Sequence, residues 1–320
     1  MVLDNLSPVV RHKFEQAIFA KLGIELTEDD PVWCSAREVV VTGGWRAGKS
    51  VRAAARALRA ALNPKVELIW LLGPDYIQAR QEFLYLLDWC YQLDLVEGRP
   101  GMPAEGQCSL KLRTGCVIQT KSAKYPERLG SVAPDGIVLC EPGQMPEEVY
   151  SMVIGRLAQK RGWMFAAGTI EDDTTHPRWV WYEDIAREWI KHEEGSDERG
   201  FSLPSWSNRF VYPLGEQDPE IIRQREKLSE YEFNRRIAGL PVGIEHPCFP
   251  ILWEGEPEQE FLIYPRAPEY IDGALGVDYG CLPLDTQVLT RDGWKTHDEI
   301  HLGDLLASCK GWNNQRNIKW

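Results

Sequence analysis

The chain has 320 residues, 43% of them hydrophobic and 26% charged, and a formal net charge of −12 at pH 7. This composition is ordinary for a globular protein of about two domains, and the acidic balance argues against a passive nucleic-acid coat protein, which would be basic. No segment approaches the roughly 20 apolar residues of a membrane helix, and segment 1–22 lacks the apolar core of a secretory signal. We therefore expect a cytoplasmic protein with no membrane partner.

Apolar runs alternate with helical stretches along the first half of the chain. After a helical entry over 1–36, we expect strands over 38–42, 66–72, 115–121, 137–141 and 163–168. Helices are expected over 49–62, 75–95, 146–157, 176–192 and 219–237. This alternation indicates an α/β fold with a parallel sheet flanked by helices. Pro and Gly cluster over 240–268, as in a linker or lid, before a new strand over 274–279.

A phosphate-binding motif joins the first strand to the following helix. The segment GGWRAGKS fits G-x-x-x-x-G-K-[ST] through Gly43, Gly48, Lys49 and Ser50, and we expect Gly44 to bind the nucleotide with them. Glycines in such a loop let backbone N–H groups surround phosphates at a helix N-terminus. We expect Lys49 to bind the β- and γ-phosphates of ATP and Ser50 to ligate Mg²⁺.

A second acidic motif ends the apolar run IVLCE. Glu141 lies where a carboxylate at the edge of the sheet would polarise the attacking water, although it could merely cap the strand. The preceding residue, usually Asp in such motifs, is Cys140, whose neutral thiol is a poor ligand for Mg²⁺. Asp135 could assist, but it comes early on the strand.

Two further residues are candidates for contact with the γ-phosphate. Arg46 lies inside the loop and could act as an arginine finger in cis, or could be an ordinary surface arginine. Thr169 ends the strand over 163–168 and could sense loss of the γ-phosphate, or be an ordinary strand-end residue.

The order of these segments resembles the large terminase subunit of tailed bacteriophages, the ATPase that packages DNA into a procapsid. The resemblance covers roughly residues 30–280 and rests on GGWRAGKS, IWLLGPDYIQARQEF, the stretch around IVLCEPGQMPEEVY, VIGRLAQKRGWMFAAGTIEDD, and the segment from FSLPSWSN to EYEFNRRIAGL. It implies a motor that acts on double-stranded DNA as a homo-oligomeric ring. Portal protein and the small terminase subunit would be its partners.

The same family pairs its ATPase with an RNase H-like nuclease. The segment GVDYG resembles the first strand of that domain, which makes Asp278 the first of several acids that hold two divalent metals. The alternative is an Asp in a strand-end turn. The other acids of such a site do not follow, so we expect nuclease activity only after completion by a second chain.

From Cys281 the sequence resembles the N-terminal splicing block of an intein. The block is carried by Cys281, the Asp-Thr pair at 285–286, a β-branched strand, a turn, and Ile-His-Leu-Gly-Asp over 300–304. Cys281 would attack the Gly280 carbonyl to form a thioester. The later intein blocks are absent, so we expect either a split intein with a C-terminal partner chain or a truncated gene. An ordinary buried thiol is the alternative.

These observations predict four segments: a P-loop ATPase over 1–205, a lid or linker over 206–268, the start of a nuclease over 269–280, and an all-β intein fragment over 281–320. The predicted function is an ATP-hydrolysing packaging motor. Two alternatives remain, namely a helicase-like P-loop ATPase and an inert host segment whose activity is protein splicing.

Overall fold

The computed structural model describes residues 7–126, 129, 132–170 and 181–242, with residue 299 and four short strands further along. The chain forms two compact units, Met1–Glu245 and His246–Trp320. Among the described residues, no helix is both long and apolar enough to cross a bilayer.

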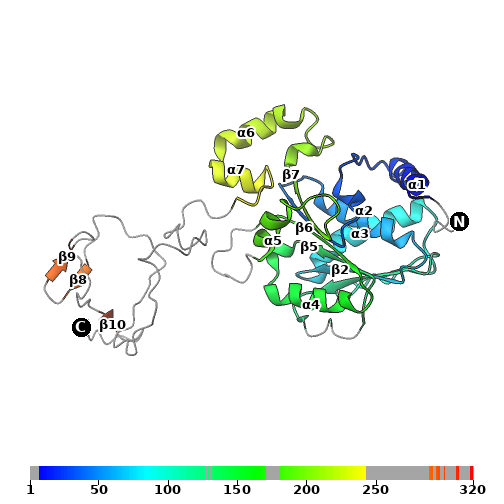
Figure 1. The fold of residues 1–320 in the computed structure, drawn as a ribbon, viewed down its shortest axis with the longest axis horizontal. Coiled ribbons are helices and arrows are strands. Elements are labelled where there is room, and N and C mark those ends of the chain that lie inside the picture. Colours follow the sequence, from blue (N-terminus) through cyan, green and yellow to red (C-terminus); the bar gives the residue numbers. More distant parts are fainter. Residues whose placement is uncertain are drawn as a thin grey trace. The chain divides into compact units, whose positions relative to one another are not determined.

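Seven strands form the sheet of the first unit, in the order β3–β4–β2–β5–β6–β1–β7 (Figure 1). Only β3 and β4 are antiparallel, so the predicted, mostly parallel α/β sheet is confirmed. The strands β3 and β7 were not predicted. The bounds are β1 (Glu38–Gly43), β2 (Leu68–Gly73), β3 (Ser109–Lys111), β4 (Val117–Ser122), β5 (Gly136–Cys140), β6 (Trp163–Gly168) and β7 (Glu198–Leu203).

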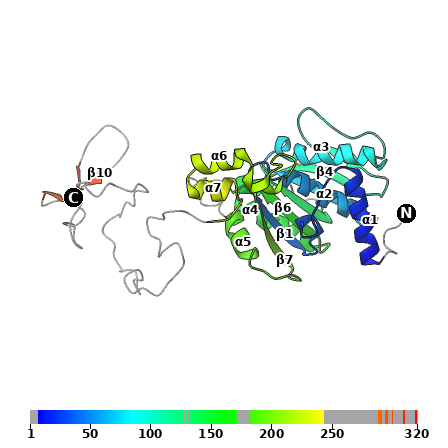
Figure 2. The same cartoon turned by 90° about the horizontal axis from the view of Figure 1, so that it is seen from above.

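Helices cover both faces of this sheet (Figure 2). Along β1, Val39 and Val41 pack toward α2 and α3, whereas Val40 belongs to the core with α4 and α5. Burial on both faces explains the unbroken apolar runs of the central strands. The helices are α1 (Pro8–Lys21), α2 (Lys49–Ala61), α3 (Tyr76–Gln92), α4 (Glu147–Ala158) and α5 (Trp181–Trp189).

The helix predicted over 219–237 is two helices, α6 (Pro219–Lys227) and α7 (Glu230–Arg236). The single-helix prediction was wrong because Ser229 begins a new helix, its hydroxyl accepting a hydrogen bond from the N–H of Glu232 at 3.1 Å. A small core of Tyr212, Ile221, Phe233 and Ile237 holds this region together. We call residues 204–242 the lid segment.

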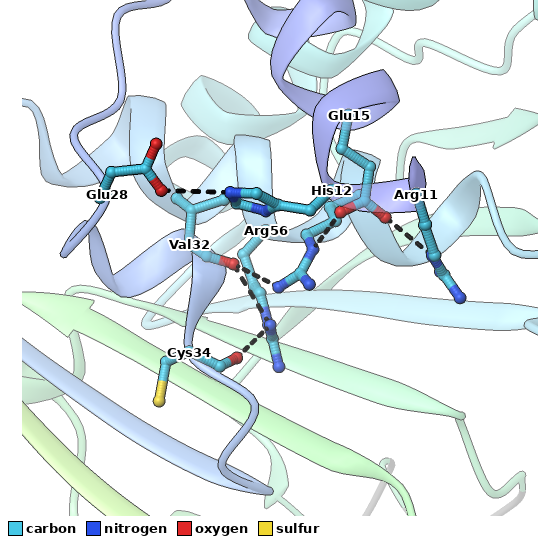
Figure 3. A network of polar contacts seen from close by, with 8 residues as sticks. Arg11, His12, Glu15, Glu28, Val32, Cys34 and Arg56 are labelled. Carbon is cyan, nitrogen blue, oxygen red and sulfur yellow. Dashed lines mark hydrogen bonds and ion pairs between the residues drawn. The ribbon is translucent and has the colours of Figure 1, made fainter. Parts of the chain in front are cut away.

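The N-terminal helix α1 is attached to the phosphate-loop helix α2 by a buried carboxylate (Figure 3). Glu15 is fully buried and pairs with Arg11 at 3.0 Å and with Arg59 of α2 at 2.8 Å. Arg56, also on α2, donates to the carbonyl of Cys34 at 2.7 Å. These contacts fix α2 against the segment before β1.

The second unit is described only as two antiparallel strand pairs, β8 (Val288–Thr290) with β9 (Gly293–Lys295), and β10 (Ser308–Cys309) with β11 (Ile318–Lys319). The β8–β9 pair coincides with the β-branched strand and turn predicted after Cys281. Residues 176–180, most of the linker, the strand predicted over 274–279, Asp278 and Cys281 itself lie outside the described residues.

Candidate nucleotide-binding site

Three neighbouring parallel strands place the candidate residues at one edge of the sheet. The order β5–β6–β1 brings together the carboxyl ends of these strands, with Cys140 opposite Ala167 and Gly168 opposite Thr42. Glu141 follows β5, Thr169 follows β6, and the phosphate loop follows β1. Ligands of open α/β sheets bind at this carboxyl edge.

The phosphate loop turns into α2 at Gly48, whose φ of 85° is left-handed and suits glycine. Lys49 is 8% exposed, and its Nζ donates to the carbonyls of Gly43, at 3.1 Å, and Gly44, at 2.9 Å. Ser50 follows on the first turn of α2. The ammonium group is thus held against the loop by the carbonyls of the loop's own first two residues.

The lid segment is hydrogen-bonded to the same loop. The N–H of Trp45 donates to the carbonyl of Arg236 at 2.7 Å, and the hydroxyl of Thr42 donates to that of Gly239 at 2.7 Å. The guanidinium of Arg236 also lies 5.3 Å from the centre of the half-exposed Trp45 ring. These contacts attach the loop and the end of β1 directly to the end of α7 and the residues after it.

Arg46 is exposed and has a left-handed backbone, with a φ of 61°. Its carbonyl accepts a hydrogen bond from Nδ2 of Asn208 in the lid segment, at 2.7 Å. The described contacts of Arg46 therefore fix its backbone and leave its guanidinium at the surface beside the loop.

Glu141 and Thr169 are in direct contact. Oε2 of Glu141 accepts from the backbone N–H of Thr169 at 3.0 Å, and the N–H of Glu141 donates to the carbonyl of Ala167 at 3.0 Å. Glu141 adopts a left-handed conformation, with φ 54° and ψ 57°. A non-glycine residue in this region is uncommon and is often found at functional sites.

Cys140, at the usual position of a metal-binding Asp, is buried. Burial raises the pKa of its thiol well above the ordinary value, and the neighbouring Glu82 and Glu141 raise it further. A sulfur atom at this position is a poor ligand for Mg²⁺, which prefers hard oxygens.

Asp135 does not take over this role. Its Oδ2 accepts from the N–H groups of Glu67 and Leu68, both at 2.9 Å, and pairs with Lys160 at 3.2 Å. These contacts lie at the start of β5, at the opposite end of the strand from Cys140. The idea that Asp135 assists the metal is therefore wrong.

One buried acid near this edge was not predicted. Glu82, on α3, is 3% exposed, and its Oε2 has no hydrogen-bond partner among the described residues. Burial, with a smaller contribution from the charge of Glu141, raises its pKa to about 7, against the opposing effects of hydrogen bonding with the Ser50 hydroxyl and the Cys140 thiol. The sequence carried a signal, since Glu82 interrupts the apolar stripe of α3 formed by Ala79, Phe83, Leu86, Trp89 and Cys90.

The residues at this edge fit a nucleotide-bound Mg²⁺ ion. Such ions keep several waters and take one or two protein oxygens beside the phosphates. Ser50 supplies a hydroxyl, and Glu82 supplies a carboxylate oxygen without a protein partner. A metal site made of protein ligands alone is not found in the described part of the chain. No group of three or more His, Cys, Asp or Glu residues there could hold a metal.

The fold of this chain is similar to that of solved large-terminase structures. The ATPase domain of the large terminase from Thermus phage P74-26 superposes with a TM-score of 0.53, at 18% identity, over 70% of this chain and 97% of that one. The large terminase of a thermophilic bacteriophage, solved in complex with ADP, superposes with a TM-score of 0.50, at 14% identity, over 72% of this chain and 53% of that one.

The first unit has the large-terminase ATPase fold. At these identities the likeness concerns the fold alone, and the chain matches about half the length of the full-length terminase. No protein-family model and no curated protein matches the sequence.

Proposed function

We propose that this chain is an ATP-hydrolysing motor subunit for viral DNA packaging. The observation that carries the proposal is the convergence of Lys49, Glu141 and Thr169 on three adjacent strand ends, with Glu141 hydrogen-bonded to Thr169. The terminase ATPase fold supports it, as does the ADP bound to one terminase of this fold.

Nucleotide binding begins at the phosphate loop. Lys49 exchanges the carbonyls of Gly43 and Gly44 for phosphate oxygens, while Gly48 lets the loop approach them closely. Ser50 would hold Mg²⁺, which when bound would neutralise charge on the β- and γ-phosphates. The N-terminus of α2 adds a favourable dipole for these anions.

Hydrolysis then depends on Glu141. Its carboxylate orients the attacking water, and the backbone N–H of Thr169 fixes the direction of that carboxylate. Thr169 registers loss of the γ-phosphate through the same contact. The guanidinium of Arg46, at the surface beside the loop, swings toward the γ-phosphate and stabilises the charge that develops there.

The deciding experiment measures ATP hydrolysis by the full chain with and without double-stranded DNA. Lys49→Ala should abolish nucleotide binding, whereas Glu141→Gln should keep ADP affinity and lower turnover by about 10²- to 10⁴-fold. Glu147→Gln, an exposed acid at the start of α4, is the matched control and should behave like the unchanged protein. Undiminished hydrolysis by Glu141→Gln would refute the role of Glu141.

A helicase-like P-loop ATPase is the competing function of the same site. It would unwind a forked duplex with a fluorophore and quencher on opposite strands, and its activity would need a single-stranded end. A packaging motor should instead be stimulated by blunt or circular duplex DNA without separating the strands. Strand separation in this assay would favour the helicase.

The wider assembly follows from the same proposal. Double-stranded DNA is the substrate track, a homo-oligomeric ring with portal protein and the small terminase subunit is the working form, and Asp278 contributes to a two-metal nuclease site. These partners rest on the sequence resemblance and on the terminase fold. Co-sedimentation of the chain with duplex DNA at several salt concentrations tests the first of them.

A second function is favoured by residues 281–304. We infer that Cys281 is the nucleophile of an intein: its sulfur attacks the Gly280 carbonyl carbon, the peptide C–N bond breaks, and a thioester and the free amine of Cys281 result. The β8–β9 hairpin at the predicted strand and turn supports this inference. A C-terminal intein partner would complete splicing.

Incubation with a small thiol tests the splicing chemistry directly. The thiol should release a fragment ending at Gly280, visible by mass spectrometry, and Cys281→Ala should abolish the release without changing ATP turnover. Cys309→Ala, a thiol in strand β10, is the control. Equal cleavage in the Cys281→Ala protein would refute the assignment.

A further inference from the structure

The acidic motif after β5 lacks the carboxylate that usually holds the metal, because Cys140 stands in its place. The side chain of Cys140 is buried and offers only sulfur, whereas Mg²⁺ prefers hard oxygen ligands. A nucleotide-bound Mg²⁺ ion at Ser50 therefore needs an oxygen ligand from another element.

Helix α3 brings such a group to the same place. Glu82 faces the Ser50 hydroxyl at the start of α2 and the Cys140 thiol at the end of β5. Both contacts follow from the fold, since α3 leaves β2, the strand beside β5, and packs against α2. Glu82 thus lies between the expected metal ligand and the side chain that replaces the usual Asp.

The Glu82 carboxylate is hydrogen-bonded to Ser50 and Cys140, but its hydrogen-bonding capacity is only partly satisfied. Its side chain is 3% exposed, and Oε2 has no hydrogen-bond partner among the described residues. The buried acid Glu15 on α1, by contrast, is paired with two arginines. A buried polar atom without a partner is costly, and a bound ion is one of the explanations for such an atom in a native structure.

We propose that Glu82 supplies the carboxylate that holds the nucleotide's Mg²⁺ ion beside Ser50, in place of the Asp that Cys140 replaces. This inference rests on the proposed ATPase function and assigns its metal site. In this arrangement the carboxylate comes from the buried face of α3 and not from the end of β5, so the local motif does not contain it. Binding of the cation would also compensate the buried charge.

The test measures ADP affinity of the full chain against free Mg²⁺, using a fluorescent ADP analogue. The unchanged protein should bind more tightly as Mg²⁺ is added. In Glu82→Gln, which keeps the shape of the side chain, the apparent Mg²⁺ affinity should fall about 10- to 100-fold. Asp88→Asn, an exposed acid on α3, makes the same charge change and should have no effect.

A relocated carboxylate should rescue the loss. Cys140→Asp in the Glu82→Gln background restores an acid at the usual position and should recover most of the Mg²⁺ dependence. Electron paramagnetic resonance of Mn²⁺ with ADP gives a second readout that does not depend on turnover. The Mn²⁺ signal should be that of the bound ion in the unchanged and doubly substituted proteins, and largely that of the free ion in Glu82→Gln.

The outcomes separate this inference from the proposed function. If the unchanged protein binds no ADP at any Mg²⁺ concentration, both fail. If it binds ADP and Glu82→Gln shows the same Mg²⁺ dependence, only the role of Glu82 is overturned. Loss of ADP binding in Glu82→Gln even in the presence of a chelator would make Glu82 a structural residue and would also overturn the inference.

Discussion

Oε2 of Glu141 accepts a hydrogen bond from the backbone N–H of Thr169, with 3.0 Å between the two atoms. The bond joins the ends of the neighbouring strands β5 and β6. Because the donor is backbone, the contact depends on the path of the chain at Thr169 and not on its side chain. A displacement of this strand end therefore moves the carboxylate directly.

Gly168→Ala should disturb this contact without touching the phosphate loop. A Cβ at Gly168 would lie 2.7 Å from Cδ of Pro142, 3.1 Å from Cα of Glu141 and 3.2 Å from its Oε2. We expect ATP turnover to fall about 10- to 100-fold, because a small misplacement of a catalytic group has effects of this size. ADP affinity, measured by fluorescence titration, should be unchanged; equal turnover would mean that the position of Glu141 is not critical.

The central sheet could be predicted from the sequence because its strands are buried on both faces. Runs such as that over 38–42 are continuous, apolar and β-branched, and the phosphate motif fixed the place of the following helix. Strand β7 was not predicted from the sequence, because Glu198, Arg199 and Ser202 give it the composition of a loop. It lies at the edge of the sheet, where only one neighbouring strand imposes its conformation.

The candidate site was predictable only where its residues follow each other along the chain. The phosphate loop and Glu141 belong to local motifs, but Glu82 reaches the site through the packing of α3 against α2 and β5. Long-range contacts of this kind leave only an indirect trace, here a charged residue in an apolar helical stripe. The hydrogen bonds from the lid segment to the loop involve backbone carbonyls, which any residue type supplies, so the residue pattern does not predict them.

Gly44→Ala should separate the lid segment from the phosphate loop. An added Cβ would lie 2.2 Å from the Ile237 carbonyl oxygen and 2.4 Å from Oγ of Ser205. Since the first obstacle is backbone, relief requires a shift of the lid segment, and we expect a loss of about 1–3 kcal/mol in the free energy of unfolding.

Limited proteolysis and denaturant unfolding check this prediction together. Cleavage within 204–242 should become faster in Gly44→Ala. The control is Gly155→Ala in α4, where an added Cβ meets nothing within 4 Å, and which should gain about 1 kcal/mol from helix propensity. If Gly44→Ala is as stable and as protease-resistant as the original protein, the lid segment can shift away from the added Cβ without a loss of stability.

The lid segment has a second attachment, an ion pair between α7 and α5. Nη2 of Arg235 lies 3.1 Å from Oε2 of Glu183, with the two side chains only 4% and 10% exposed. Arg235→Ala removes a buried partner of the Glu183 carboxylate and should reduce the free energy of unfolding by about 3–5 kcal/mol.

Arg187 provides the matched control, because it contacts the same Glu183 at 3.4 Å but is 38% exposed. Arg187→Ala should change the free energy of unfolding by less than about 1 kcal/mol. Urea unfolding followed by circular dichroism measures both. If the two substitutions cost the same, burial of the Arg235 pair has no importance for attachment of the lid segment.

The pH dependence of stability should change in Glu198→Gln, far from the nucleotide site. Glu38 on β1 is opposite Glu198 on β7, and burial, followed by the Glu198 charge, raises the pKa of Glu38. A carboxyl whose folded pKa is raised binds its proton more tightly in the folded state. Its stabilising contribution is therefore complete below the unfolded pKa and is lost as pH rises through the folded pKa.

Removing the Glu198 charge lowers the folded pKa of Glu38 and should reduce this loss. We expect Glu198→Gln to raise the free energy of unfolding by about 0.5 kcal/mol at pH 8, a value typical of like charges facing each other across strands, and to leave it unchanged at pH 3. The contact of Glu198 with His192 is long, at 3.8 Å, and exposed, so its loss offsets little of this gain.

Urea unfolding at several pH values, compared with the exposed control Glu194→Gln, measures the difference. Glu82, the other acid with a raised pKa, is present in all three proteins, so its contribution cancels. A gain that is equal at pH 3 and pH 8 would contradict the electrostatic explanation. Of the two effects of this substitution, loss of the Glu198 charge depends on pH and a change in strand propensity does not. An equal gain at both pH values would therefore mean that the substitution acts through strand propensity.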